Sequence, residues 1–464
     1  GIGGDCFVLL KPAGEERVLA LNGSGRAPAA ASAAALRDQG HDTVPLRGVE
    51  AVTLPGSMDA FCRLSNEWGK LGLDRVLAPA IHYAEEGVPV APRVAFDWAD
   101  DAPFLQGKAR DFFLLDGAVP RAGQIFRAKG QAEVLRRVAR QGRAGFYEGE
   151  VAEDLIGSLN ALSGAHTLDD LAATHCTWGE PVAGDYGDVT VLEHPPNGQG
   201  ATAILMLNIL KHFDLKSMNP FGAQRAHIEA EAGKLAYDTR NRFIAEHSPR
   251  LDHMLSDATA AKLAALIDPN RASPNPNPLA EAIHRDTIYI SVVDRDRMAV
   301  SLIYSIYYGF GVGLASSKFG VIFQNRGAGF SLTKGHPNEL MGGKRPMHTI
   351  IPGMLKRKGK VIMPFGVMGG AYQPTGHARF VSNITDFGMD TQAAVDGPRS
   401  FSWVDGMEVE RGYSQDVRAQ LAQMGHKVIT PPDALGGAQN ILMQDSGVLI
   451  GASDPRKDGC ALGY

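Results

Sequence analysis

The sequence predicts a mixed α/β fold in which helices flank stacked β-sheets. Three observations support this prediction. Apolar residues recur at helical spacing in the first half of the chain, and short runs typical of strands follow in the second half. A linker rich in proline and asparagine separates the two halves. With 464 residues, of which 44% are hydrophobic, the chain can bury a large core and is long enough for two or three domains.

The expected helices lie before the linker. In each segment, apolar residues are three and four positions apart, which places them on one face of a helix. These segments are residues 81–86, 134–140, 204–213 and 226–243.

The linker covers residues 268–278, where repeated proline and asparagine oppose both helix and strand. Two interpretations remain open for it. It is either an ordinary surface loop or a tail that moves away from an active site after the chain is cut.

The expected strands follow the linker. Each is a short run rich in β-branched or aromatic residues and bounded by turn residues. The runs are residues 288–293, 299–306, 321–323, 359–365 and 407–410.

Composition and charge point to a small-molecule substrate. The net charge is −5 with both signs dispersed, so no basic stripe suggests nucleic acid and no basic amphipathic face suggests a membrane. No apolar run reaches the roughly 18 residues of a membrane span. The cysteines are widely spaced and the histidines scattered, so neither a metal site nor a disulfide framework is expected. The cysteines are Cys6, Cys62, Cys176 and Cys460.

Thr287 is the strongest candidate for a catalytic residue. A polar, proline-rich loop runs into this threonine, which opens a strand-like run. If the bond between Asp286 and Thr287 is cleaved, Thr287 presents a hydroxyl nucleophile and an α-amino base on one residue. The alternative is an ordinary threonine at the start of a β-branched strand, which β propensity alone explains.

The run from Thr287 to Asp294, followed by residues 299–301 and 309–311, resembles the beginning of the small subunit in the γ-glutamyltranspeptidase family. Other segments resemble family blocks and occur in the same order. They are residues 1–7, 54–57, 79–87, 145–149, 195–200, 344–346, 369–370 and 394–399.

This resemblance implies the four-layer αββα sandwich of N-terminal nucleophile hydrolases, with two stacked, mainly antiparallel sheets flanked by helices. Residues 1–286 would form a mostly helical large subunit that contributes strands to the shared core and ends in a processing loop, residues 268–286. Residues 287–464 would form the small subunit, and the two would share one intertwined domain. The assembly stays open between one heterodimer and a dimer of heterodimers.

The chain begins inside a recognisable block without an initiator methionine. Relatives carry a strand and a helix before this block, so we expect the amino-terminal region, with any export signal, to be absent here. Localisation therefore stays open between cytoplasm and periplasm.

The resemblance also implies catalytic roles. The Thr287 hydroxyl would attack the substrate carbonyl while its amine takes the proton, and water would resolve the acyl-enzyme without a metal or organic cofactor. Ser305 lies where the family places a hydroxyl that hydrogen-bonds the nucleophile. Gly369 and Gly370 match the pair whose N–H groups form the oxyanion hole. The alternatives are a surface serine on a strand and a simple turn.

The sequence departs from the family where true transpeptidases hold the α-ammonium of a γ-glutamyl group. Their acidic or amide residue and their aspartate before a Phe-Ser pair are replaced by Arg326 and Gly329. A cation is unfavourable where an ammonium should bind. This pocket is therefore not expected to select a free α-amino acid.

Further departures lie nearby. The family's serine pair becomes His348 and Thr349, and an asparagine becomes Tyr307. Ala33 stands near the position of the arginine that usually binds a carboxylate. Arg26 could take that task, because its guanidinium can hold a carboxylate with two hydrogen bonds.

These substitutions favour the family's acylase and amidohydrolase branches, which include cephalosporin acylases and oxamate amidohydrolases. Arg26, Arg326 and His348 could together form a pocket for an anionic acyl group. The leading hypothesis is a self-processing hydrolase of a small amide that bears a carboxylate. The alternatives are a true γ-glutamyl hydrolase or transpeptidase acting on glutathione-like substrates, and a non-catalytic relative used as a binding module.

Overall fold

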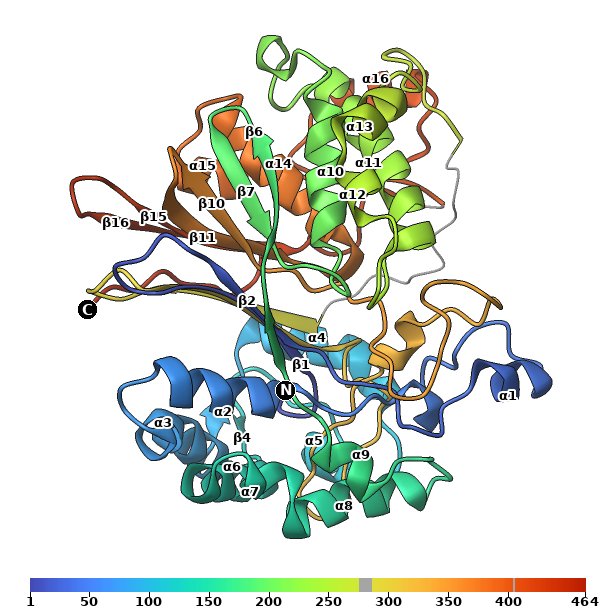
Figure 1. The fold of residues 1–464 in the computed structure, drawn as a ribbon, viewed down its shortest axis with the longest axis vertical. Coiled ribbons are helices and arrows are strands. Elements are labelled where there is room, and N and C mark those ends of the chain that lie inside the picture. Colours follow the sequence, from blue (N-terminus) through green and yellow to red (C-terminus); the bar gives the residue numbers. More distant parts are fainter. Residues whose placement is uncertain (275–285, 404) are drawn as a thin grey trace.

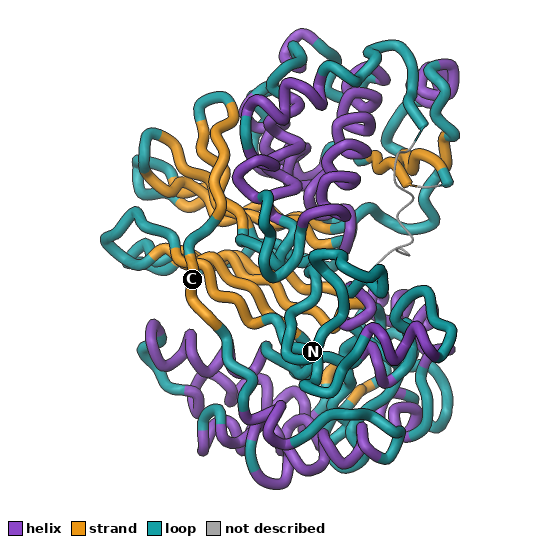
Figure 2. The backbone as a smooth tube through the Cα atoms, turned by 45° about the vertical axis from the view of Figure 1, so that its right-hand side comes forward, coloured by secondary structure: helices purple, strands orange, loops and turns teal. Residues whose placement is uncertain are grey.

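The computed structural model describes residues 1–274, 286–403 and 405–464. Most of the expected processing loop after Pro274 therefore lies outside the described residues. In Figure 1 two sheets stack at the centre, with one group of helices below the first sheet and another beside the second. Figure 2 shows the same four layers from another side, so the expected sandwich of helices and sheets is confirmed.

The described strands have these bounds. They are β1 (Asp5–Lys11), β2 (Leu19–Gly23), β3 (Val88–Pro89), β4 (Ile125–Phe126), β5 (Thr177–Gly179), β6 (Val182–Tyr186), β7 (Val189–Glu193), β8 (Asp286–Val293), β9 (Ala299–Tyr307), β10 (Gly353–Arg357), β11 (Lys360–Met368), β12 (Ser400–Trp403), β13 (Gly406–Val409), β14 (Val428–Ile429), β15 (Gly437–Met443) and β16 (Leu449–Ser453).

The described helices have these bounds. The α-helices are α1 (Ala33–Asp38), α2 (Ser57–Trp68), α3 (Leu73–Glu86), α4 (Pro92–Asp101), α5 (Lys108–Phe113), α6 (Lys129–Gln141), α7 (Ala144–Tyr147), α8 (Gly149–Asn160), α9 (Leu168–Ala172), α10 (Gly200–Leu210), α11 (Ala223–Phe243), α12 (Leu251–Leu255), α13 (Asp257–Ala264), α14 (Gln373–Thr385), α15 (Thr391–Asp396) and α16 (Gln415–Gln423). The 3₁₀ helices are η1 (Val49–Ala51), η2 (Ala102–Phe104), η3 (Leu215–Ser217), η4 (Arg326–Gly329) and η5 (Gly370–Tyr372).

The first sheet has the strand order β5-β2-β1-β9-β8, and its pairs are antiparallel. Side chains of β1 alternate between its two faces, as a strand requires. Cys6 and Val8 pack with Ala60 of α2, on the helical side. Phe7 and Leu9 pack toward the second sheet. This strand is buried on both faces and lies at the centre of the molecule.

The second sheet has the strand order β16-β15-β11-β10-β7-β6, again antiparallel. Helices α10 and α14 cover its outer face. Its inner face meets the first sheet closely, since a Cβ added to Gly366 would lie 2.3 Å from the Tyr289 ring. Glycine at this position lets the two sheets approach.

The expected helices and most expected strands are confirmed, with α3, α6, α10, α11, β8, β9, β11 and β13 at those places. The expected strand at residues 321–323 is wrong. Within this run, Ile322 forms an isolated bridge to Ala315. Val321 and Phe323 instead pack into a core cluster made mostly by helices, which explains the apolar character of the run. Strands also occur before the linker, namely β1, β2 and β5 to β7.

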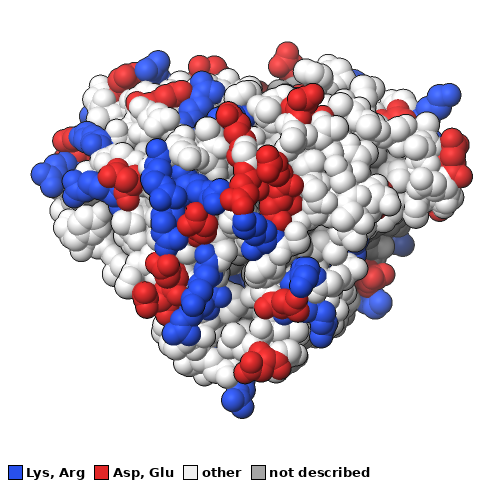
Figure 3. Space-filling view, turned by 90° about the horizontal axis from the view of Figure 1, so that it is seen from below, with Lys and Arg blue, Asp and Glu red and all other residues white. Residues whose placement is uncertain are grey.

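Charged side chains of both signs are interspersed on the face shown in Figure 3. Among the described helices, none combines the length and apolar character that crossing a bilayer requires.

Candidate active site

The candidate nucleophile lies at the start of β8, at the edge of the first sheet. Thr287 pairs with Ser305 of β9, and the pairing is irregular between Asp286 and Thr287. The Thr287 side chain is buried, with 8% of its surface exposed, and its Oγ1 donates a hydrogen bond to Ser305 Oγ at 3.2 Å. The strand register therefore brings the predicted nucleophile and its predicted hydroxyl partner together.

Ser305 forms hydrogen bonds both with Thr287 and with the backbone at the end of β9. Its side chain is 2% exposed, so it is not a surface serine, and its Oγ also accepts the backbone N–H of Tyr307 at 2.9 Å. Tyr307 has φ +82°, a backbone conformation that costs energy for a residue with a side chain. The hydrogen bond to Ser305 helps to hold this conformation.

Arg326 lies against this strained residue. Its guanidinium carbon is 4.0 Å from the centroid of the Tyr307 ring, and its Nη1 donates to Thr349 Oγ1 at 2.8 Å. All three side chains are buried. A cation stacked on an aromatic ring is stabilised by the ring quadrupole. The structure thus joins three of the predicted pocket residues in one chain of contacts.

His348 differs from the role expected for it. The ring is fully buried, and its Nε2 donates to Asp5 Oδ2 at 3.0 Å, since a carboxylate only accepts. Its Nδ1 accepts the Ile350 N–H at 3.4 Å, and its ring packs on Phe7. Burial, reinforced by the charge of Arg326, lowers the pKa of His348 to about 3. His348 is therefore neutral and supplies no positive charge to a substrate pocket.

Gly369 and Gly370 follow β11 and begin the turn into η5 and α14. Their φ angles are +133° and +57°, and a Cβ on Gly369 would lie 2.9 Å from Gly436 Cα, so this turn requires glycine at that position. Within the described residues, neither amide N–H has a hydrogen-bond acceptor. Gln199 Nε2 donates to the carbonyls of both Gly370 and Thr349, which links the turn to the Arg326 contacts.

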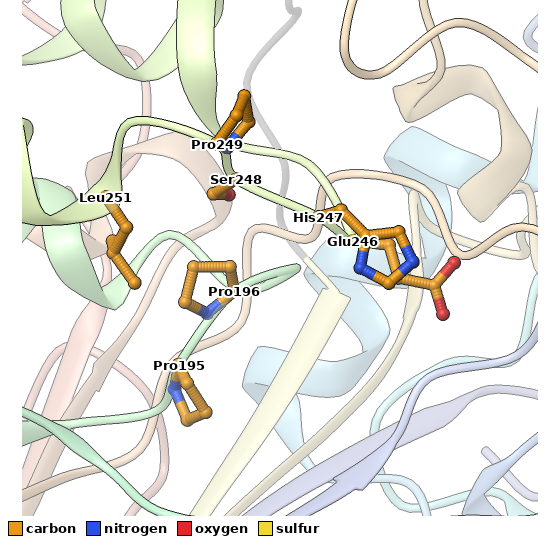
Figure 4. Close-up of a pocket in the computed structure, with 7 residues that line it drawn as sticks. All are labelled: Pro195, Pro196, Glu246, His247, Ser248, Pro249 and Leu251. Atoms are coloured by element: carbon orange, nitrogen blue, oxygen red, sulfur yellow. The ribbon is translucent and has the colours of Figure 1, made fainter.

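Arg26 lies in a different environment. Its Nη1 donates to Glu246 Oε1 at 2.6 Å and to the Gly343 carbonyl at 2.8 Å. Glu246 lines an open hollow, shown in Figure 4, together with residues 195, 196, 247–249 and 251. A substrate carboxylate would have to compete with Glu246 for Arg26. The prediction for Arg26 thus has weaker geometric support than that for Arg326.

Sequence reasoning missed Asp5 and Gln199. Asp5 was noted only as part of a glycine-rich block, although an aspartate at the start of an otherwise apolar strand is a signal of a buried polar contact. Gln199 stands between two other family-like residues and has no distinguishing pattern of its own.

In the described part of the chain, one group of side chains has atoms close enough together to bind a metal: His227, Glu231 and His426. His227 Nδ1 and His426 Nε2 are hydrogen-bonded at 2.8 Å. Glu231 accepts the Lys234 ammonium at 2.6 Å and the Ser273 N–H at 3.0 Å. A divalent cation would have to displace that ammonium. The group is better explained as an anchor for the start of the linker.

Comparisons with known proteins agree with this geometry. Residues 1–464 match the model of the gamma-glutamyltranspeptidase family. A glutathione hydrolase-like YwrD proenzyme of Bacillus subtilis and an oxamate amidohydrolase proenzyme of Klebsiella pneumoniae are each 33% identical, and each match covers the whole chain and 90% of the relative. The crystal structure of a cephalosporin acylase from Bacillus halodurans superposes with a TM-score of 0.92 at 36% identity, covering all of this chain and 88% of that one.

Proposed function

The chain belongs to the γ-glutamyltranspeptidase family and is an N-terminal nucleophile hydrolase, and we propose that it activates itself by cleavage before Thr287 and then hydrolyses a small amide bearing a carboxylate. The observation that supports this most directly is the hydrogen bond from Thr287 Oγ1 to Ser305 Oγ at the first residues of β8. It holds the hydroxyl at the point where the β-strand follows the linker.

The chemistry needs no second catalytic side chain to take the proton. After cleavage, the freed α-amine of Thr287 accepts the proton of its own hydroxyl as the oxygen attacks the substrate carbonyl. Collapse of the tetrahedral intermediate expels the amine, which takes that proton, and leaves an ester on Thr287 Oγ1. Water then attacks the ester, and the α-amine again takes and returns the proton.

We assign the oxyanion hole to the N–H groups of Gly369 and Gly370. Their freedom from acceptors in the described structure supports this role, as does their place at the amino-terminal end of η5 and α14, where the helix dipole favours negative charge. Met368, the residue before them, packs with Tyr289, two positions after Thr287. The two glycines and Thr287 thus both adjoin the apolar cluster between the sheets to which Tyr289 belongs.

Arg326 is the group we propose for the substrate carboxylate. Its guanidinium lies on the Tyr307 ring, and Tyr307 N–H contacts Ser305, the partner of the nucleophile. A planar guanidinium can hold a carboxylate with two parallel hydrogen bonds. This arrangement favours an acidic acyl group over a γ-glutamyl group, whose α-ammonium it would repel.

The two segments on either side of Thr287 would then be subunits of one domain. Residues before the linker supply β1, β2, β5, β6 and β7, and residues from 286 onward supply the other strands of the two sheets. Antiparallel pairing of β1 with β9 and of β7 with β10 joins the segments in both sheets. Such pairing would keep the processed pieces together.

The test is intact mass spectrometry of the wild type and of Thr287→Ala, followed by amidase assays. We expect two fragments only in the wild type, and faster hydrolysis of oxamate or a cephalosporin-type amide than of γ-glutamyl-p-nitroanilide. Equal rates on these substrates would favour a γ-glutamyl hydrolase. An uncut and inactive wild type would refute the proposal and favour a binding module.

A further inference from the structure

We infer that Asp5 is a positioning residue for the proposed substrate pocket, because its buried carboxylate fixes both the segment that bears Arg326 and the segment that bears Thr349. This inference rests on the proposed function and concerns a residue that makes no direct contact with the nucleophile.

Asp5 belongs to the same row of the first sheet as the nucleophile. In the strand register, Asp5 of β1 lies opposite Ser305 of β9, and Ser305 lies opposite Thr287 of β8. Residues directly opposite each other in antiparallel strands point to the same face of a sheet. The Asp5 carboxylate therefore lies on the face that carries the proposed chemistry, and it is fully buried there.

Three segments that are distant in sequence donate to this carboxylate. Oδ1 accepts the Gly25 N–H at 2.9 Å and Gln324 Nε2 at 2.8 Å, and Oδ2 accepts His348 Nε2 at 3.0 Å. A carboxylate that accepts several hydrogen bonds holds its partners in a defined geometry, because each donor has a separate lone-pair direction.

Two of these donors stand beside the proposed substrate-binding residues. Gln324 precedes Arg326 by two positions, and His348 immediately precedes Thr349. Arg326 and Thr349 are themselves joined by a hydrogen bond of 2.8 Å. The carboxylate and this hydrogen bond thus close a small ring of contacts. If the carboxylate is lost, the two segments are free to move apart and Arg326 loses its fixed place.

His348 fits this role better than direct substrate binding. Its ring is wholly buried and lies on Phe7, and both ring nitrogens are engaged, one with Asp5 and one with the Ile350 N–H. The low pKa of His348 agrees with a neutral donor. His348 therefore transmits the position of Asp5 to Thr349.

The test compares Asp5→Asn with the wild type on two amides, one with a carboxylate and one without. An asparagine has the same shape but turns one acceptor into a donor, so either one of the three contacts breaks or His348 changes tautomer and loses the Ile350 N–H. We expect KM for the carboxylate-bearing amide to rise 10- to 100-fold. We expect kcat for both substrates, and KM for the neutral one, to change less than about threefold.

Two further variants separate positioning from a general loss of structure. In an Arg326→Gln background, Asp5→Asn should add nothing further to KM, because residues acting through one contact are not additive. The matched control is Glu193→Gln, which alters another fully buried carboxylate paired with a histidine, His377, at 2.7 Å. It should leave KM for both amides near wild type.

If Asp5→Asn does not fold, the histidine tests the same link. His348→Met removes the donor to Asp5 and should raise KM in the same substrate-dependent way. His348→Gln keeps an amide donor near the Nε2 position and should restore most of the loss.

The inference is overturned if Asp5→Asn raises KM equally for both amides. It is also overturned if KM of the double variant rises by the product of the increases caused by Asp5→Asn and Arg326→Gln alone. Failure of the underlying proposal looks different, because the wild type itself would then show no preference for the carboxylate-bearing amide, and the role of Asp5 would fall with it.

Discussion

Replacing Ser305 with alanine tests the core of the proposed mechanism. Ser305 Oγ accepts two hydrogen bonds, from Thr287 Oγ1 at 3.2 Å and from the Tyr307 N–H at 2.9 Å. In Ser305→Ala, the Tyr307 N–H loses this acceptor in a buried position. The loss of a buried hydrogen bond costs about 0.5–1.5 kcal/mol in the free energy of unfolding.

The effect on rate follows from the second hydrogen bond. Without Ser305 Oγ, the Thr287 hydroxyl is no longer held in one rotamer, and losing one such hydrogen bond raises the barrier by roughly 1–2 kcal/mol. That corresponds to a fall of about 5- to 30-fold in kcat and in the rate of self-cleavage.

Ser301→Ala is the matched control. Ser301 lies four residues earlier on β9, is equally buried, and makes two hydrogen bonds, with the Tyr289 hydroxyl at 2.8 Å and to the Phe365 carbonyl at 3.1 Å. Both variants should lower the urea midpoint by similar amounts, but only Ser305→Ala should slow cleavage, followed by intact mass, and turnover. Equal slowing in both variants, or unchanged rates in Ser305→Ala, would refute the reasoning.

Three other predictions concern the turn, the buried histidines and metals. Gly369→Ala should lower kcat by roughly 100- to 1000-fold at little change in KM, because the added Cβ meets Gly436 and displaces a proposed oxyanion-hole donor; steady-state kinetics decide this. The pKa values of His194 and His348 are lowered to about 4 and about 3, so the unfolded state binds protons first as the pH falls below about 6.5. The histidine contribution to the free energy of unfolding should therefore be complete above that pH. Toward pH 4 it should fall by up to about 1.4 kcal/mol per pH unit for each histidine. Urea titrations at several pH values should show a smaller slope for His348→Gln than for the wild type. Treatment with a chelator should change neither cleavage nor turnover, since Lys234 already neutralises the one candidate ligand group in the described ranges; loss of activity that zinc restores would contradict this.

Much of the fold could be predicted from the sequence because its long helices and its strands have clear periodicity. The strand expected at residues 321–323 failed for a physical reason, since a short apolar run has the same pattern whether it pairs or only packs. Alternation did not reveal β1, because this strand is buried on both faces and reads as an unbroken apolar run.

The site was predictable only in part. The resemblance implied a hydrogen bond between Ser305 and Thr287, and the register of β8 and β9 places these two residues opposite each other. It did not show that His348 faces Asp5, a contact between residues 343 positions apart. Nor did it show that Glu246 already engages Arg26. Charge inferred from residue type alone ignores burial and partners, which decide whether a histidine is a cation.

The contacts of Tyr307, Arg326, His348 and Thr349 suggest that the departures from the family pattern form one structural unit. The Tyr307 ring lies under Arg326, Arg326 bonds Thr349, and Thr349 follows the histidine held by Asp5. A change at one position alone would remove a contact that another of these buried residues makes, and a lost hydrogen bond of this kind costs about 0.5–1.5 kcal/mol. Arg326→Gln with Thr349→Val should therefore show a coupling free energy of roughly 0.5–3 kcal/mol in a double-mutant cycle on KM for the carboxylate-bearing amide. Additive effects would mean that each residue contacts the substrate on its own.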